Sequence, residues 1–261
     1  MDTNRMPRAV ALQYDNGELV YPAGGKPVLI EYAFNGCGLR AFGKSAHFLA
    51  DPRFKRAHAR GWNSGHKKAA HIDDNRWITH VALWAASQAA QTEGDFVECG
   101  VDTGMLSLAI CDWLDFNTLD RDFWLFDTFA GIPDEQMTEA ERQGIGGWHN
   151  RNSYEECYEL ARANFAPWPR CKLVRGTVPE TLAAFPADRR VAYLSVDMNI
   201  VLPEIAALAF FWDRMSKGGV ILLDDYGWSS HAAQRNAFDD FARAHGAAIL
   251  SVPTGQGIIV R

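Results

Sequence analysis

The feature that most constrains this sequence is a regular alternation of short apolar segments with longer amphipathic ones, which begins near Asp73. Such alternation predicts strands and helices that build a mostly parallel sheet with helices on both faces. We expect a helix start at Pro203 and a helix stop at Lys217, Gly218 and Gly219. The expected strands cover residues 95–100, 122–127, 171–176, 191–197, 219–225, 247–252 and 257–261, and the expected helices cover residues 72–91, 104–116, 153–165, 203–216 and 230–245.

The connection between the last two expected strands is very short. Only residues 253–256, Pro-Thr-Gly-Gln, separate them. A parallel crossover needs roughly a dozen residues, so these strands must form an antiparallel hairpin. We therefore expect an α/β fold with a seven-stranded, mostly parallel sheet that ends in an antiparallel hairpin.

Residues 1–70 differ in character from the rest of the chain. β-like segments at 9–14, 18–21 and 27–34 are separated by Asn-Gly and Gly-Gly turn signals, and a helical stretch rich in Arg, Lys and His follows over about 51–71. We interpret residues 1–70 as an N-terminal β-hairpin and helical extension that caps the protein or pairs subunits in a homo-oligomer. Residues 71–261 would then form the main domain.

The composition excludes several classes of protein. A formal net charge of -6 gives no indication of a nucleic-acid partner. The chain lacks a basic start followed by an apolar run, and no apolar run approaches the roughly 18 residues of a membrane span. We expect a cytoplasmic protein without a signal peptide. The cysteines are odd in number, scattered and without a C-x-x-C pair, which favours a reducing compartment over disulfides or zinc: Cys37, Cys99, Cys111, Cys157 and Cys171.

The segment FVECGVDTG (96–104) is a candidate cofactor loop, in which an apolar strand enters a glycine-bearing turn. Gly100 and Gly104 would let the backbone approach a ligand closely, although a plain tight turn also uses such glycines. Glu98 could meet the ammonium of a methionine-bearing cofactor, and Asp127, after the next strand, could accept both ribose hydroxyls. The alternative for both carboxylates is a solvated or capping role. Thr128, Gly176 and Thr177, at the ends of neighbouring strands, complete the expected cofactor-binding set.

Two further strands end in aspartates, in SVDMN (195–199) and LLDDY (222–226). If these strands are neighbours, Asp197, Asp224 and Asp225 converge at one edge of the sheet. Three close carboxylates repel one another unless a cation lies among them, and hard oxygen ligands suit Mg²⁺. The alternative is that one aspartate caps a helix and another faces solvent.

The motifs FVECGVDTG, LFDTFAGIP (125–133), LSVDMN and KGGVILLDDYG (217–227) together resemble the macrocin/mycinamicin-type sugar O-methyltransferases over about residues 75–261. This resemblance implies a Rossmann-like class I methyltransferase fold and a Mg²⁺-dependent reaction with S-adenosylmethionine. Glu98, Gly100 and Asp127 would hold S-adenosylmethionine, and the three aspartates would hold Mg²⁺. The substrate would be a small-molecule or glycan sugar that offers two adjacent hydroxyls. Family members often have Leu-Asp-Gly-Asp at 196–199, where this chain has Val-Asp-Met-Asn, and this departure bears on substrate class more than on metal binding.

The residues also suggest how the acceptor hydroxyl would be activated. Our first choice of base is Asp197, and the second is His149, in the Gly-rich stretch GIGGWHNRNS (144–153), which we interpret as a mobile lid loop. The alternative for His149 is an exposed loop histidine. Trp148 and Trp228, expected in strand-end loops, would stack on adenine or sugar, or only pack.

The sequence leaves open the role of a basic stretch and the choice among several competing functions. The basic stretch would fit a phosphate-bearing substrate or, alternatively, a solvated helix face. Competing functions are a metal-dependent catechol or vicinal-diol methyltransferase and a non-catalytic nucleoside-binding module. An NAD-linked dehydrogenase is disfavoured by the incomplete glycine pattern and the terminal hairpin. The basic stretch comprises Arg53, Lys55, Arg56, Arg60, Lys67 and Lys68, with His58 and His66 among them.

Overall fold

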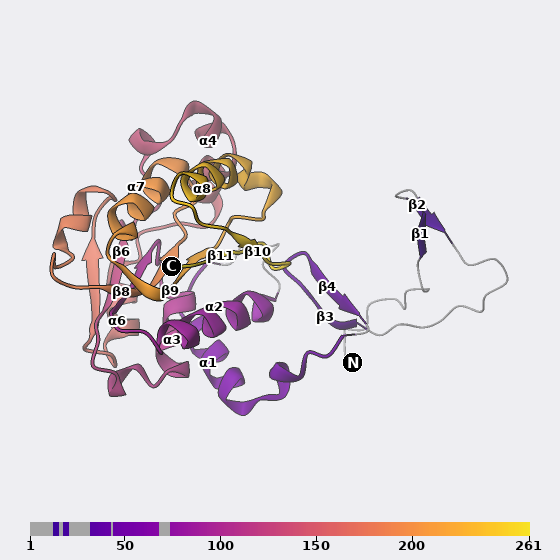
Figure 1. The fold of residues 1–261 in the computed structure, drawn as a ribbon, viewed down its shortest axis with the longest axis horizontal. Coiled ribbons are helices and arrows are strands. Elements are labelled where there is room, and N and C mark those ends of the chain that lie inside the picture. The colour runs from indigo at the N-terminus through magenta and orange to yellow at the C-terminus, as the bar shows by residue number, and fades with distance from the viewer. Residues whose placement is uncertain (1–12, 16–17, 21–31, 43, 68–73) are drawn as a thin grey trace.

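The computed structural model describes residues 13–15, 18–20, 32–42, 44–67 and 74–261 (Figure 1). Two short antiparallel pairs, β1 with β2 and β3 with β4, precede the main sheet. The strands and helices are β1 (Gln13–Asp15), β2 (Glu18–Val20), β3 (Tyr32–Gly36), β4 (Leu39–Phe42), α1 (Pro52–Trp62), α2 (Arg76–Ala89), β5 (Asp95–Cys99), α3 (Met105–Trp113), β6 (Phe123–Asp127), α4 (Glu139–Gln143), α5 (Ile145–Asn152), α6 (Tyr158–Phe165), β7 (Cys171–Arg175), β8 (Val191–Val196), α7 (Val201–Trp212), β9 (Met215–Leu223), α8 (Ala232–Ala244), β10 (Leu250–Ser251) and β11 (Gly257–Val260).

The main sheet has seven strands in the order β10-β11-β9-β8-β5-β6-β7. β5 to β9 are mutually parallel, and β11 is antiparallel to both of its neighbours, β9 and β10. The predicted class I methyltransferase sheet with its C-terminal antiparallel hairpin is confirmed. The strand order reverses between β5 and β8, and ligands of open α/β sheets bind at the carboxyl ends of the strands beside such a reversal.

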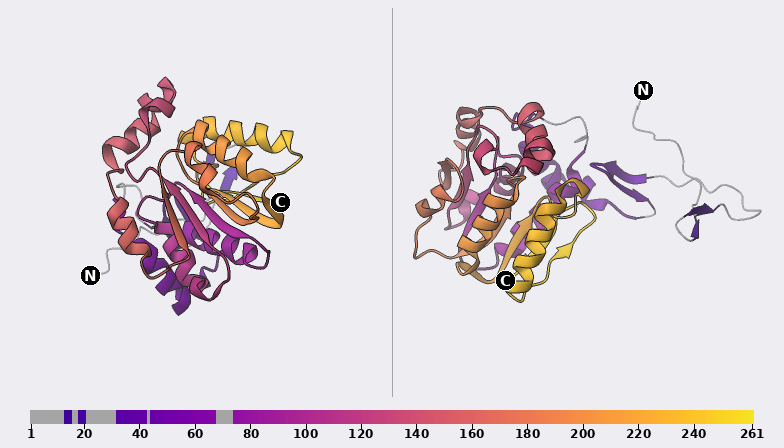
Figure 2. Two further views of the ribbon diagram at one scale, coloured as in Figure 1. Left: turned by 90° about the vertical axis from the view of Figure 1, so that its left-hand side faces the viewer. Right: turned by 90° about the horizontal axis from the view of Figure 1, so that it is seen from above.

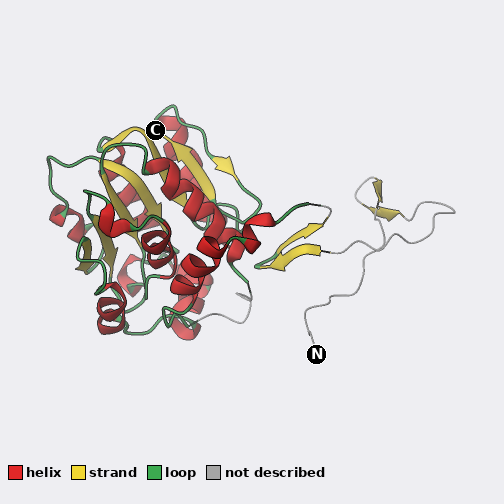
Figure 3. Ribbon diagram, turned by 90° about the horizontal axis from the view of Figure 1, so that it is seen from below, coloured by secondary structure: helices red, strands yellow, loops and turns green. Residues whose placement is uncertain are grey.

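Helices cover both faces of the sheet (Figures 2 and 3), and an apolar layer lies on each face. Neighbouring residues of one strand point to opposite layers: Phe96 and Tyr193 pack with α1, α2 and α3, whereas Val97 and Leu194 pack with α7 and α8. This alternation follows from the two-residue repeat of a strand. α1 contributes Phe54 to the first layer, so this part of residues 1–70 packs as part of the main domain. The division of the chain at residue 70 stays a prediction.

The helix expected over 51–71 ends at Trp62, and the next helix begins at Arg76 rather than at residue 72. Asp51 caps the first helix by accepting a hydrogen bond from the Arg53 amide at 2.7 Å. Of the expected N-terminal strands, the structure shows β1, β2 and β3, and it adds β4, which we did not expect. The remainder of segments 9–14 and 27–34, like Lys68, lies outside the described residues.

Three other expectations were wrong in detail. α7 ends at Trp212, and the strand β9 begins at Met215, before the glycines expected to stop the helix. Gly218 has φ +82° and lies where the register between β8 and β9 shifts, so it serves an irregularity of the strand. The Gly-rich stretch 144–153 is mostly the helix α5 rather than a loop, and α6 begins at Tyr158 rather than at residue 153. In the described part of the chain, no helix has the length and apolarity to cross a membrane.

Candidate functional site

A cavity opens at the carboxyl edge of the sheet. The ends of β5, β6, β8 and β9 form its floor, α5 and the start of α2 border it, and its lining includes most of the expected site residues. These are Glu98, Gly100, Asp127, Thr128, His149, Gly176, Asp197, Asp224 and Asp225. Gly104 and Thr177 are not among the lining residues, so the structure does not place these two at the cavity.

The two glycines of the cofactor loop are needed for different structural reasons. Gly100 has φ +93°, and a Cβ on it would lie 1.8 Å from the Asp197 carbonyl oxygen, so only glycine lets β5 pass this close to β8. Gly104 has φ +96°, and a Cβ there would lie 2.5 Å from the Phe165 ring. Its role is to pack α3 against α6, which is why it is absent from the cavity lining.

Asp127 holds the cofactor loop in place. One of its carboxylate oxygens accepts from the Val101 and Asp102 amides at 2.5 and 2.7 Å, and the other accepts from the Phe129 amide at 2.6 Å. Burial raises the pKa of Asp127, and these three hydrogen bonds oppose that shift. The carboxylate therefore orients backbone as well as facing the cavity, a role that sequence reasoning missed.

Glu98 presents a buried carboxyl group to the same cavity. Its side chain is 3 % exposed, and Oε2 has no hydrogen-bond partner among the described residues. Burial raises the pKa of Glu98 from 4.5 to about 8, and the nearby Asp224 and Asp127 add to the shift. A buried carboxyl with one unused oxygen fits a cationic partner such as an amino-acid ammonium.

The structure brings the three aspartates together. Asp197, Asp224 and Asp225 each offer an oxygen within 4.8 Å of the other two. Burial raises the pKa of all three, and mutual repulsion raises those of Asp197 and Asp225 further. Gln256 donates to Asp224 at 2.9 Å, and His231 lies 3.4 Å from Asp225 Oδ2, which makes no hydrogen bond in the described part of the chain. This donor set fits a hard divalent cation.

Two buried glutamates shape the loop after Asp197. Glu204 accepts from the Met198 and Asn199 amides at 3.0 and 2.8 Å, and Glu141 accepts from the Val201 amide at 2.9 Å. Together they hold Asn199 at φ +63°. An acidic residue in the first turn of a helix is a start signal, and Glu204 could have been recognised on that ground.

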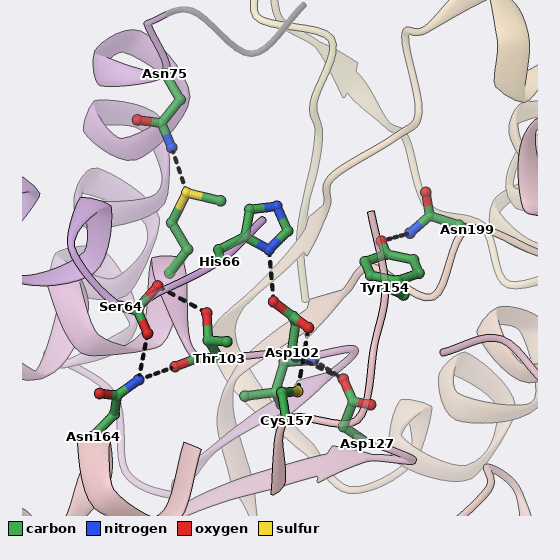
Figure 4. Close-up of polar contacts among 12 residues, drawn as sticks. Ser64, His66, Asn75, Asp102, Thr103, Asp127, Tyr154, Cys157, Asn164 and Asn199 are labelled. Atoms are coloured by element: carbon green, nitrogen blue, oxygen red, sulfur yellow. Dashed lines mark hydrogen bonds and ion pairs between the residues drawn. The ribbon is translucent and has the colours of Figure 1, made fainter. Parts of the chain in front are cut away.

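The side chains above the aspartates are aromatic. His149 lies on α5 and lines the cavity, with its ring stacked on Tyr154 at 5.2 Å and 6.5 Å from His231. The Tyr154 hydroxyl accepts a hydrogen bond from the side-chain amide of Asn199 at 3.0 Å (Figure 4). Tyr154 and His231 were not predicted as site residues. Trp228 lines the cavity in the turn after β9, whereas Trp148 lies on α5 and is not among the lining residues.

A second group of polar contacts ties the segment after α1 to the cofactor loop (Figure 4). His66 Nδ1 lies 2.6 Å from an Asp102 oxygen, the Cys157 thiol donates to the other at 3.3 Å, and the Ser64 and Thr103 hydroxyls are 2.8 Å apart. Burial acts to raise the pKa of Asp102, but the hydrogen bond and charge of His66, together with hydrogen bonds from the Thr103 amide and the Cys157 thiol, outweigh it and the pKa is lowered. Sequence reasoning gave His66 only as part of the basic stretch.

The arginines of α1 make their contacts outside this cavity. Arg56 pairs with Asp112 at 2.8 Å, and Arg53 lies over the Trp113 ring at 4.4 Å. Arg60 lies over another tryptophan, Trp168, at 5.2 Å. None of these arginines lines the cavity, so the geometry does not support a phosphate contact from this helix.

Comparison with known families and relatives gives consistent matches. The family described as Macrocin-O-methyltransferase (TylF) matches residues 50–250. The demethyldecarbamoylnovobiocin O-methyltransferase of Streptomyces niveus is 30% identical over 139 residues, which span 51% of this chain and about half (53%) of that relative. An 8-demethyl-8-(2,3-dimethoxy-alpha-L-rhamnosyl)-tetracenomycin-C 4'-O-methyltransferase of Streptomyces olivaceus is 25% identical over 254 residues, 90% of each chain.

Solved structures share the fold. The O-methyltransferase NovP matches with a TM-score of 0.66 at 20% identity, over 82% of this chain and 98% of that one. The calicheamicin methyltransferase CalS11 matches with a TM-score of 0.58 at 16% identity, over 83% of this chain and 93% of that one.

Proposed function

Because this chain belongs to the macrocin O-methyltransferase (TylF) family of S-adenosylmethionine-dependent O-methyltransferases, we propose that it methylates a sugar hydroxyl of a glycosylated natural product. The relative that aligns over 90% of this chain has a rhamnosyl 4'-O-methyltransferase name, which supports a sugar acceptor. The observation that carries the proposal is the cavity in which Glu98 and the three aspartates share one sheet edge. Such a cavity can hold a cationic methyl donor beside a chelated hydroxyl.

The cofactor side of the cavity is built from β5 and β6. S-adenosylmethionine supplies an activated methyl group on a sulfonium. Glu98 would bind its ammonium, and the loop around Gly100, held by Asp127, would lie against its nucleoside part. Methyl transfer is an in-line displacement, so the main contribution of these residues is alignment of donor and acceptor.

The acceptor side is built from the ends of β8 and β9. Asp197, Asp224 and Asp225 would hold a divalent cation such as Mg²⁺, since their oxygens lie close together and Asp225 Oδ2 makes no hydrogen bond in the described part of the chain. A divalent cation bound there would lower the pKa of an acceptor hydroxyl. The same carboxylates would orient the two adjacent hydroxyls of the sugar.

A base must take the proton of the acceptor hydroxyl. We assign this role first to Asp197, which lines the cavity and would lie beside an acceptor held by the aspartates. Asn199 donates to Asp197 at 3.3 Å and so limits its rotation. His149, which also lines the cavity, is the second choice. A pH profile of kcat for Asp197→Asn and for His149→Gln separates the two assignments.

The proposal is tested by methyl transfer to a panel of glycosides, with and without EDTA. We expect EDTA and Asp224→Ala each to abolish most turnover, and Asp240→Ala, an exposed aspartate of α8, to retain it. Restoration by added Mg²⁺ would support the metal assignment. Turnover that survives both EDTA and Asp224→Ala would remove the cation from the reaction, and preference for a catechol panel would exclude the sugar acceptor.

A further inference from the structure

We infer that the turn of the β3–β4 hairpin and Trp228 form a selectivity wall for an uncharged, apolar group attached to the methylated sugar. We give the name aglycone wall to Cys37 and Trp228, which line the cavity, together with Gly38, which lies in the same turn as Cys37 beside the Trp228 ring. The inference rests on the proposed function, because it concerns the part of the acceptor beyond the sugar. It predicts that the group attached to the sugar is not a nucleoside diphosphate.

The hairpin lies outside the residues that match the family, yet it borders the same cavity. The family match begins at residue 50, whereas Cys37 is a lining residue and is 8 % exposed. A Cβ built on Gly38 would lie 3.9 Å from the Trp228 ring, which is ordinary contact distance. Figure 1 shows the turn end of the hairpin beside the β10–β11 end of the sheet.

The turn is fixed against the main domain. The Phe34 ring is 4 % exposed and meets the Trp77 ring edge-to-face at 6.3 Å. Gly36 approaches the start of α2 so closely that a Cβ would lie 2.5 Å from the Asp74 Cβ. These contacts place the turn at a defined position along the cavity wall.

Trp228 is held from the other side by a second turn. Gly255 has φ +93°, and a Cβ there would lie 2.6 Å from the indole nitrogen. The Gly227 amide donates to the Gly255 carbonyl at 2.6 Å, and the Trp228 amide donates to the Asp225 carbonyl at 3.2 Å. The indole thus lies between two turns. In the sequence, Trp228 follows Asp225, one carboxylate of the cluster, by three residues. A group next to a sugar held by that cluster would meet an aromatic surface.

The side chains that line the cavity do not favour a diphosphate. Neither lysine nor arginine occurs among its described lining residues. The arginines of α1 that could have met a phosphate instead contact α3 and Trp168. A diphosphate next to the sugar would have no lysine or arginine to pair with among the described lining residues, whereas an uncharged apolar group would meet the aglycone wall. Six carboxyl groups line the cavity: Glu98, Asp102, Asp127, Asp197, Asp224 and Asp225.

The test compares three rhamnosides: methyl rhamnoside, naphthyl rhamnoside and a nucleoside diphosphate rhamnose. Their dissociation constants are measured by calorimetry with S-adenosylhomocysteine present, and their kcat/KM values by methyl transfer. We expect naphthyl rhamnoside to bind most tightly of the three. The affinity for the nucleoside diphosphate rhamnose should not increase when the salt concentration is lowered. Trp228→Ala should lower the naphthyl-to-methyl affinity ratio about tenfold, the effect of losing ~1.4 kcal/mol of aromatic contact.

Two more variants complete the test. Cys37→Met, which leaves the indole in place, should weaken naphthyl rhamnoside more than methyl rhamnoside by narrowing the cavity. Arg40→Ala, at an exposed position of β4, should leave the affinity ratio at the wild-type value. Tightest binding by the diphosphate, or an unchanged ratio in both Trp228→Ala and Cys37→Met, would overturn the inference. Tight naphthyl binding without methyl transfer would instead contradict the proposed function and leave the aglycone wall supported.

Discussion

Replacing Glu98 by glutamine should change both stability and cofactor binding, in a way that depends on pH. The pKa of Glu98 rises from 4.5 to about 8 on folding, chiefly through burial. Below pH 4.5 the carboxyl is protonated in both the folded and the unfolded chain, so its ionisation does not lower the free energy of unfolding. Between pH 4.5 and 8 only the unfolded chain loses the proton, so stability falls as pH rises. At about 1.36 kcal/mol per pKa unit, the cost reaches about 5 kcal/mol above pH 8.

Glu98→Gln should therefore be more stable than the wild type at high pH. The difference in melting temperature between Glu98→Gln and the wild type should be larger at pH 8.5 than at pH 4.5 by ~10–20 °C, at ~2–4 °C per kcal/mol for a domain of this size. The same variant should bind S-adenosylhomocysteine more weakly by about tenfold or more, since a hydrogen bond to a charged partner contributes ~1.5–3 kcal/mol. Thermal melts and calorimetry measure the two effects.

Cofactor binding to the wild type should also release a proton near pH 7. The buried carboxyl is mostly protonated before binding, and an ammonium favours its ionised form. Calorimetry in buffers of different ionisation enthalpy measures this release, and Glu180→Gln, an exposed glutamate, serves as the control. Equal cofactor affinity in Glu98→Gln and the wild type, together with parallel stability curves against pH, would refute the reasoning.

Three other changes probe the surroundings of the site. His66→Ala removes the 2.6 Å contact with Asp102 and should raise the KM for S-adenosylmethionine about tenfold while changing kcat less, because a charged hydrogen bond that orders the cofactor loop is lost; an unchanged KM would contradict this. Gly104→Ala should lower the free energy of unfolding in urea by ~2–4 kcal/mol, since a Cβ would meet Phe165 at 2.5 Å at a φ of +96°. Added Mg²⁺ should tighten S-adenosylhomocysteine binding about tenfold. The charge of Asp224 contributes to the raised pKa of Glu98, so a cation that offsets this charge would favour the ionised Glu98 that binds an ammonium. EDTA should reverse the effect.

The sheet could be predicted because its signals are local. Strands such as Val191–Val196 are short and apolar, and a four-residue connection forces a hairpin. The helix α5 could not be predicted in this way, because its glycines suggest a loop. Gly147 lies so close to the Arg142 carbonyl that a Cβ would be 1.9 Å from the oxygen, so packing against α4 stabilises a helix that local propensity disfavours.

The same distinction applies to the candidate site. Asp197, Asp224 and Asp225 could be expected to converge because each follows a strand, and parallel strands end at one edge. The contacts of Asp102 with His66 and Cys157 join residues 36 and 55 positions apart. No periodic pattern encodes such pairs, so His66 could not be distinguished from His58, the other histidine of its basic stretch.

The cavity combines two kinds of wall with different origins. Its carboxylates stand at strand ends, which the sheet topology places together. Its apolar wall comes from the β3–β4 turn and the turn after β9, segments that can change without moving the strands. Under the two proposals above, a change of acceptor would involve Cys37, Gly38 or Trp228, whereas a change at the aspartates would alter the chemistry itself. Since the hairpin lies before the family-matched residues, this part of the proposed aglycone wall would be free to change without any change at the strand ends that carry the carboxylates.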